Sequence, residues 1–154
     1  VLMLDAMHRY PLNAELQACG CMAVGQLGGS EMRVKRRAAQ GGIVKLIFTA
    51  MERHPKDGHV QRQGCSALRH FTSNSQENKS FIGQQGGVEK LCSAGRRFLA
   101  TDRRVLSEAL GALCHLASKH PENKQRIFQA GALELAMEAS AGPPVGAATT
   151  RSAA

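Results

Sequence analysis

The residues best suited to chemistry in this sequence are five cysteines and six histidines. Cys19 and Cys21 form a Cys-Gly-Cys pair, but a single intervening residue is too few for the usual zinc-binding pairs. No second Cys/His pair stands at a suitable distance. We therefore expect no metal site and interpret Cys21 and Cys65, which hold the same position in two repeats, as small structural residues, and Cys92 and Cys114 show no partner pattern either. Their odd number and scattered positions favour reduced thiols and a cytoplasmic protein.

Sequence motifs of common catalytic sites do not occur in the chain. It contains no Gly-x-Ser-x-Gly, no Gly-x-x-x-x-Gly-Lys-Ser/Thr and no His-Glu-x-x-His. Cys114 and His115 are adjacent, so on a helix they would point in different directions and could not form a nucleophile–base pair. We therefore predict neither an enzyme nor a cofactor.

A basic run places four positive charges within five residues, at Arg33, Lys35, Arg36 and Arg37. Two interpretations are open: a patch for acidic protein or phosphate, or the solvated face of a helix. A second basic rim can be drawn from Arg53, Arg62, Arg96, Arg97, Arg103 and Arg104. The formal net charge of +8 favours acidic partners through long-range attraction.

The elements that must position these residues are repeated helices. Three segments begin at Glu15, His59 and Arg104, and counted from the second residue of each they carry apolar or small residues at the same offsets of 0, 4, 7, 8 and 11. These offsets mark one face of an α-helix. The residues are Leu16, Gly20, Ala23, Val24 and Leu27, then Val60, Gly64, Ala67, Leu68 and Phe71, then Val105, Ala109, Ala112, Leu113 and Leu116.

A glycine recurs between the other helices of each repeat. Gly41, Gly86 and Gly131 are 45 residues apart, whereas Gly20 and Gly64 are 44 apart, which predicts that one residue has been lost or gained in the connection after Leu27. Glycine ends a helix at little steric cost because it adopts left-handed geometry. We predict short first helices at about 31–40, 77–85 and 122–130, second helices at about 42–53, 87–99 and 132–140, and third helices at about 13–28, 58–73 and 103–119.

This pattern divides the chain into repeats. We expect the end of a preceding partial repeat at 1–12, repeats at 13–57 and 58–102, an incomplete repeat at 103–140 and a disordered low-complexity tail at 141–154. The chain opens inside a helical pattern, as a fragment of a longer array would. Leu2, Leu4 and Met7 would then form an uncovered apolar face at which the chain could self-associate.

The repeat resembles the armadillo repeat over residues 1–140. The residues that carry the resemblance are 63–71, Asn78, Lys79, Ile82, 86–88 and Leu91, with counterparts at 111–116, Asn123, Lys124, Ile127, 131–133 and Leu135. HEAT repeats are the near alternative, but they have two helices and usually lack this glycine. The resemblance implies an all-α fold, an armadillo-type α-solenoid in which three-helix repeats form a right-handed superhelix.

The same resemblance implies that third helices line a concave groove for an extended peptide. The groove residues would be Cys19, Met22, Gln26, Gln63, Ser66, His70, Glu108, Gly111 and His115. Armadillo proteins of the importin-α branch use a Trp and an Asn on each third helix. Here the Trp positions hold Met22, Ser66 and Gly111 and the Asn positions hold Gln26, His70 and His115, so a reader of basic nuclear signals is not expected.

Gln and His side chains can both donate and accept hydrogen bonds, so these three could grip a peptide backbone. The alternative is that they are only solvated. Imidazole ordinarily gains a proton at about pH 6.5, so a histidine-containing groove would hold acidic peptides more tightly as the pH falls.

We therefore predict a scaffold or adaptor that binds an extended protein segment, with a weak preference for an acidic one. Two alternatives remain: a structural slice of a longer solenoid with no binding site of its own, and a basic solenoid that binds nucleic acid. Scarce aromatic residues and interspersed glutamates make nucleic acid the weaker choice. No apolar run reaches the roughly 18–20 residues that cross a bilayer.

Overall fold

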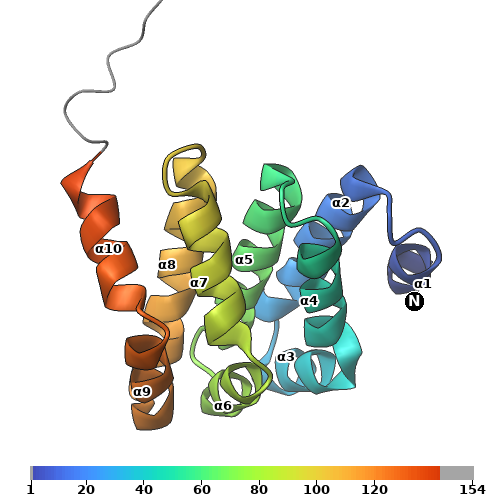
Figure 1. Cartoon of the computed structure of the whole chain (residues 1–154). Coiled ribbons are helices and arrows are strands. Elements are labelled where there is room, and N and C mark those ends of the chain that lie inside the picture. The colour runs from blue at the N-terminus through green and yellow to red at the C-terminus, as the bar shows by residue number, and fades with distance from the viewer. Residues whose placement is uncertain (1, 143–154) are drawn as a thin grey trace, which may run out of the picture.

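The computed structural model describes residues 2–142, and these residues form helices and short connections with no strand among them (Figure 1). The all-α prediction is thus confirmed. The helices are α1 (Leu2–Arg9), α2 (Ala14–Gly25), η1 (Gln26–Gly29), α3 (Met32–Ala38), η2 (Ala39–Ile43), α4 (Val44–Arg53), α5 (Gly58–Thr72), α6 (Gln76–Gln84), α7 (Gly87–Phe98), α8 (Arg103–Ala117), α9 (Pro121–Gln129) and α10 (Ala132–Ala141). Residues 143–154, most of the predicted tail, lie outside the described residues, whereas Ala141 ends α10.

Polar caps set where the long helices begin. Asn13, Asp57 and Asp102 precede α2, α5 and α8, and their side chains accept hydrogen bonds from the first turn. The distances are 3.0 Å from the Leu16 amide to Asn13 and 2.9 Å from the Val60 amide to Asp57. Such caps satisfy backbone donors that have no partner within the helix.

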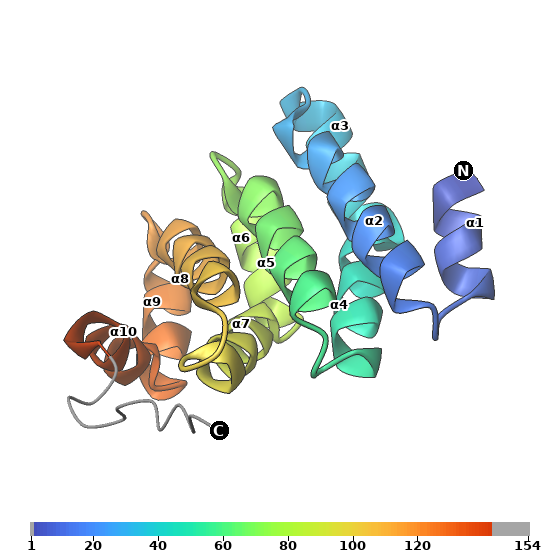
Figure 2. The ribbon, with the colours of Figure 1, turned by 90° about the horizontal axis from the view of Figure 1, so that it is seen from above.

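The helices fall into three groups that pack in the same way: α2 to α4, α5 to α7, and α8 to α10. In Figures 1 and 2, α5 lies beside α2 on one side and α8 on the other, α4 and α7 form a second row in front of them, and α10 lies beyond α8 at the end of the molecule. The shorter helices α3, α6 and α9 lie along one edge. Exposed residues of α2, α5 and α8 can therefore share one surface.

The sharp bends lie at glycines, but the first bend is not where we predicted it. Gly42, Gly86 and Gly131 have φ angles of 102°, 82° and 69°, and Gly41 is not among the residues with positive φ. Gly42 and Gly86 are 44 residues apart, as are the buried pair Val44 and Val88. The Gly41-Gly42 pair allowed two alignments, and the positive φ of Gly42 selects the one with the shorter spacing.

It follows that no residue is lost or gained in the connection after Leu27, and that prediction was wrong. Matching positions are 44 residues apart between the first two groups and 45 apart between the last two, as the caps Asn13, Asp57 and Asp102 illustrate. The extra residue lies in the connection from α7 to α8, just before Asp102. A surface loop accommodates it without disturbing helix packing.

Glycine residues, which have no side chain, allow the helices to approach closely. A Cβ at Gly64 would lie 2.6 Å from Cγ of Met51, and a Cβ at Gly20 would overlap the side chain of Met7. Met7 is therefore buried, and our prediction that it lies on an uncovered face was wrong. Leu4 is half-buried, and Leu2 is 88% exposed.

Buried polar side chains tie one group to the next. The ammonium group of Lys79 donates to the carbonyl of Ser118, at the end of α8, over 2.7 Å, and Lys35 donates in the same way to Ser73 at the end of α5. Burial lowers the pKa of both lysines, and the neighbouring charge of Lys79 lowers the pKa of Lys35 further.

The asparagine of the repeated Asn-Lys pair also holds helix ends. Asn78 donates to the carbonyl of Phe71 over 3.0 Å, and Asn123 donates to the carbonyls of Lys79 and Leu116 over 2.9 and 3.3 Å. Both side chains are fully buried. The Asn-Lys motif therefore satisfies C-terminal carbonyls that the helices themselves leave unpaired.

We predict that Lys79→Met lowers the free energy of unfolding by about 1–3 kcal/mol, because the Ser118 carbonyl loses its donor. Lys124 occupies the matching position in the last group but is exposed. Lys124→Met is therefore the matched control and should change stability by no more than about 0.5 kcal/mol. Urea denaturation followed by circular dichroism measures both. Equal stability of the two variants would contradict the bridging role of Lys79.

Candidate functional site

The nine predicted groove residues occupy three matching positions on adjacent helices. All nine are exposed or half-buried. Cys19, Gln63 and Glu108 form the first row, Met22, Ser66 and Gly111 the second, and Gln26, His70 and His115 the third. Because α5 packs directly against both α2 and α8, the rows run across neighbouring helices. Gln26 differs slightly in placement, since it begins the 3-10 helix η1.

A basic depression of about 450 Å³ lies across the first halves of α5 and α8. Its lining consists of Arg62, Gln63, Ser66, Arg103, Arg104, Ser107 and Glu108. The structure thus brings together three arginines of the basic rim drawn from the sequence. The other three, Arg53, Arg96 and Arg97, line different depressions.

Arg69 connects the residues of this surface, and the sequence reasoning did not single it out. Its guanidinium pairs with Glu108 at 3.2 Å, and its Cδ lies 3.2 Å from where a Cβ at Gly111 would stand. Its backbone carbonyl accepts a hydrogen bond from Nδ1 of His115 over 3.2 Å. The sequence offered one signal for Arg69, namely that it occupies the position of Gly25 and Cys114 on the neighbouring helices.

This ion pair changes the electrostatics expected for the groove. Glu108 would repel an acidic ligand if it stood alone, but Arg69 offsets its charge. Both side chains are partly exposed, so the pair contributes only about 0–1 kcal/mol to stability. Its main effect is to leave the positive charges of the depression uncompensated.

The polar third row is only partly free. A carbonyl can only accept, so the bond to Arg69 places a hydrogen on Nδ1 of His115 and leaves Nε2 for a ligand. His70 and Gln26 are exposed. The row therefore offers polar atoms on each of the three neighbouring helices.

The basic run in α3 does not form the patch of four charges considered above. Lys35 is buried and holds the Ser73 carbonyl. Arg36 pairs with Glu77 at 3.0 Å, and only Arg33 and Arg37 remain as exposed charges of the run outside such a pair. Lys35 lies on the side of α3 that faces Ser73, the residue that ends α5.

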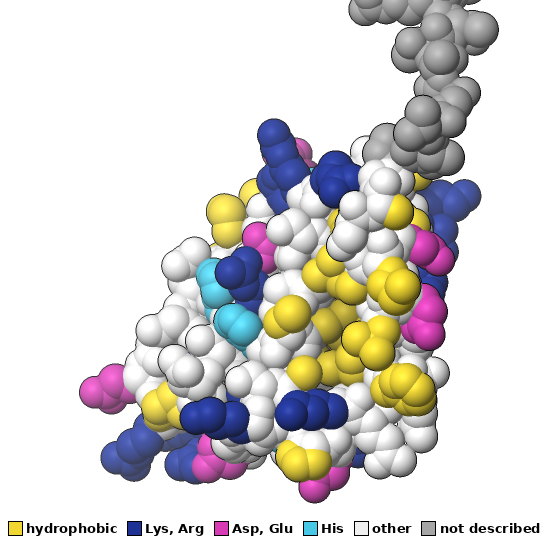
Figure 3. All heavy atoms as spheres, turned by 90° about the vertical axis from the view of Figure 1, so that its left-hand side faces the viewer, with side chains coloured by type: hydrophobic (Ala, Val, Ile, Leu, Met, Phe, Trp, Pro, Cys, Tyr) yellow, Lys and Arg dark blue, Asp and Glu magenta, His cyan; other side chains and the backbone are white. Residues whose placement is uncertain are grey.

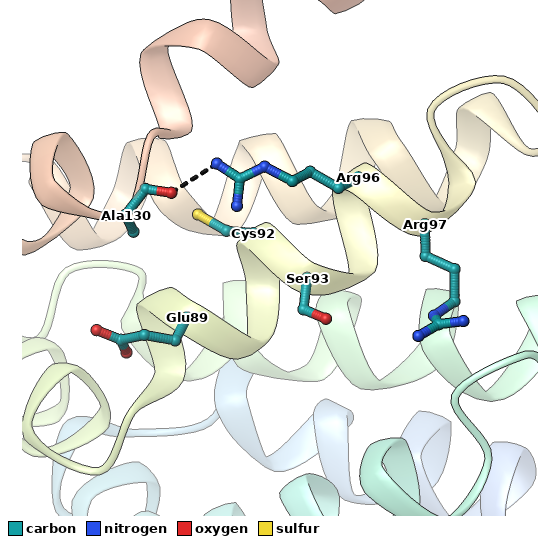
Figure 4. A pocket seen from close by; sticks show the side chains of 6 residues that line it. All are labelled: Glu89, Cys92, Ser93, Arg96, Arg97 and Ala130. Carbon is teal, nitrogen blue, oxygen red and sulfur yellow. Dashed lines mark hydrogen bonds between the residues drawn. The ribbon is translucent and has the colours of Figure 1, made fainter.

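A second depression, of about 510 Å³, lies beside α7 (Figure 4). Its lining is Glu89, Cys92, Ser93, Arg96, Arg97 and Ala130. Arg96 reaches across it and donates to the carbonyls of Ala130 and Gly131 over 2.6 and 2.9 Å. Its guanidinium is thus used to hold the bend between α9 and α10.

The cysteines separate into buried and exposed sets. Burial raises the pKa of Cys21 to about 12 and also raises those of Cys65 and Cys92. Cys19 and Cys114 are exposed. Cys19 and Cys21 therefore face different environments, and within residues 2–142 no three His, Cys, Asp or Glu side chains cluster as a metal site would require.

Compared with protein-family models, curated proteins and solved structures, the chain gives no significant match. Nor is any helix in the described part of the chain long and apolar enough to cross a membrane.

We predict that a brief treatment of the native protein with iodoacetamide modifies Cys19 and Cys114 and spares Cys21 and Cys65. The reason is that only a thiolate reacts, and the buried thiols are both inaccessible and raised in pKa. Peptide mass spectrometry identifies the modified sites. Denatured protein, in which all five cysteines should react, is the control. Early modification of Cys65 would show that α5 is not packed as described.

Proposed function

We propose that the chain is an armadillo-type α-solenoid, a right-handed superhelix of three-helix repeats, and that it serves as a protein-interaction module. It would bind an extended partner segment across α2, η1, α5 and α8. The observation that carries the proposal is the set of three rows, in which residues at matching positions of adjacent helices remain accessible. A reducing, cytoplasmic location belongs to the same proposal, in keeping with five free cysteines.

The partner segment is expected to be acidic. Arg62, Arg103 and Arg104 line the depression, although Arg103 also donates to the carbonyl of Ala139 over 3.2 Å, and Arg69 offsets the only carboxylate in its lining. Packed helices lie about 8–10 Å apart, so three of them span about 20 Å, which about six extended residues cover. A short peptide is therefore long enough to touch all three helices.

We predict that an array of acidic peptides of about eight residues captures the chain, and that Arg104→Glu lowers affinity by about tenfold or more through like-charge repulsion. Arg97→Glu is the matched control, because Arg97 is an exposed arginine that lines the other depression, beside α7. Fluorescence anisotropy with a captured peptide measures both. An equal loss in the two variants would reduce the effect to net charge and remove the case for this site.

The third row makes a separate prediction. The double variant His70→Ala, His115→Ala should weaken binding of the same peptide, because the peptide backbone loses two hydrogen-bond partners. His59→Ala is the control, since His59 is exposed but lies outside the three rows. An affinity that the double variant leaves unchanged would make these histidines merely solvated residues.

The same measurements decide between the alternatives. Nucleic acid binding would show as capture of a labelled oligonucleotide with a steep salt dependence. Failure to bind either probe would favour a structural slice of a longer solenoid.

A further inference from the structure

The face formed by α8, α9 and α10 is apolar, and it lies apart from the rows of the proposed groove. Figure 3 shows hydrophobic side chains gathered on this end of the molecule. Phe128, Leu133 and Met137 are 67%, 53% and 72% exposed. We call these three residues, together with Cys114 and Lys124, the end face.

Matching positions in the other two groups show what this face lacks. Leu133 corresponds to Val44 and Val88, and Met137 corresponds to Phe48 and Cys92. All four of those residues are buried. In each earlier group the second-row helix is covered by a long helix: α5 packs on α4, and α8 packs on α7. No helix in the described part of the chain covers α10 in this way.

Lys124 differs from its counterparts in the other two groups in the same way, because it is exposed where they are buried. Its counterparts Lys35 and Lys79 are buried, and each donates to the carbonyl that ends the covering helix, Ser73 for α5 and Ser118 for α8. Lys124 is exposed. An ammonium group at this place suits the C-terminal end of a helix, where carbonyls are unpaired and the dipole is negative.

We propose that the end face binds an amphipathic α-helix of a partner protein, placed on α8 and α10 as α5 is placed on α2 and α4. The last carbonyls of the bound helix would meet Lys124. Its packing face needs small residues at its centre, because Gly64 and Ala109 hold that position in α5 and α8.

A second copy of this chain cannot supply the helix that packs on the end face. Its α2 is the long helix nearest an end, but α1 already packs on α2, with Met7 against Gly20 as Met51 lies against Gly64. Docking α2 on α10 would put α1 where α10 stands. The long helices α5 and α8 are held within the molecule.

The test uses a peptide with the sequence of residues 102–118, in which Cys114 is replaced by Ser. Its packing face of Val105, Ala109, Ala112 and Leu116 is the face that α8 buries in the fold. Isothermal titration with the whole chain should detect binding. Met137→Glu in the protein should weaken it by about tenfold or more, and Lys124→Met by about threefold to tenfold.

Glu138→Gln is the matched control on α10, because Glu138 is exposed and corresponds to the exposed Ser93. A control peptide that also carries Ala112→Glu should not bind. Leu133 and Met137 are already exposed, so substituting them leaves the fold intact, which circular dichroism would verify.

Cross-linking locates the peptide. Gly25 of α2 contacts Ala67 of α5: a Cβ placed at Gly25 would lie 3.2 Å from the Cβ of Ala67. When the peptide packs on α8 as α5 packs on α2, the matching pair is Cys114 of the protein and Ala112 of the peptide. A short bis-maleimide should therefore join Cys114 to a peptide carrying Ala112→Cys, in protein with Cys19→Ser.

Absence of binding, or equal binding by Met137→Glu and wild type, would overturn the proposal. So would a dimer in sedimentation analysis that is lost in Met137→Glu and excludes the peptide, since the occupant would then be a second copy. Because the acidic-peptide site lies on other residues, its failure would leave this result unaffected.

Discussion

The packing of α5 between α2 and α8 is the contact on which the rest of this structure depends. It requires small residues, since a Cβ at Gly28 would lie 2.7 Å from the Cβ of His70 and one at Gly25 only 3.2 Å from Ala67. Close approach of helices brings their polar ends into the interior, where unpaired carbonyls are costly. The buried side chains of Lys35, Asn78, Lys79 and Asn123 donate to such carbonyls, so packing and hydrogen bonding support each other.

This arrangement explains why the candidate functions lie on surfaces. The buried faces of α2, α5 and α8 are committed to the core, and their remaining faces form three accessible rows. Arg69 shows how the contact shapes the chemistry of these rows: it fills the space beside Gly111, pairs with Glu108 and orients His115. The positive depression follows from that pairing.

The two proposed surfaces have different physical origins. The groove surface is polar and repeats along the chain, so its ligand is expected to be extended and its recognition electrostatic. The end face is apolar because residues that are covered in two groups are uncovered in the third. Its ligand is expected to be a helix, and its binding would come mainly from burial of apolar surface.

Local signals in the sequence were sufficient for the helices. Caps such as Asp57, the apolar offsets from Val60, and left-handed glycines such as Gly86 act within one or two turns, so the all-α class and most helix positions could be predicted. The nine groove residues could also be placed on matching positions, because the helical period alone decides which residues share a face.

Contacts between groups could not be read in this way. The adjacent glycines Gly41 and Gly42 allowed two alignments of the repeats, and only the backbone of the folded chain shows that Gly42 forms the bend. Lys35 resembles a surface charge in sequence, but the carbonyl that it binds belongs to a residue 38 positions away. Met7 is buried because Gly20 leaves room for its side chain. The charge of Glu108 is offset by Arg69, which is 39 positions away in the chain but lies on the adjacent helix. The sequence by itself determined the helices and their faces, because those depend on neighbouring residues. The tertiary structure decided which charges and apolar side chains remain accessible, because burial depends on packing partners that are distant in the chain.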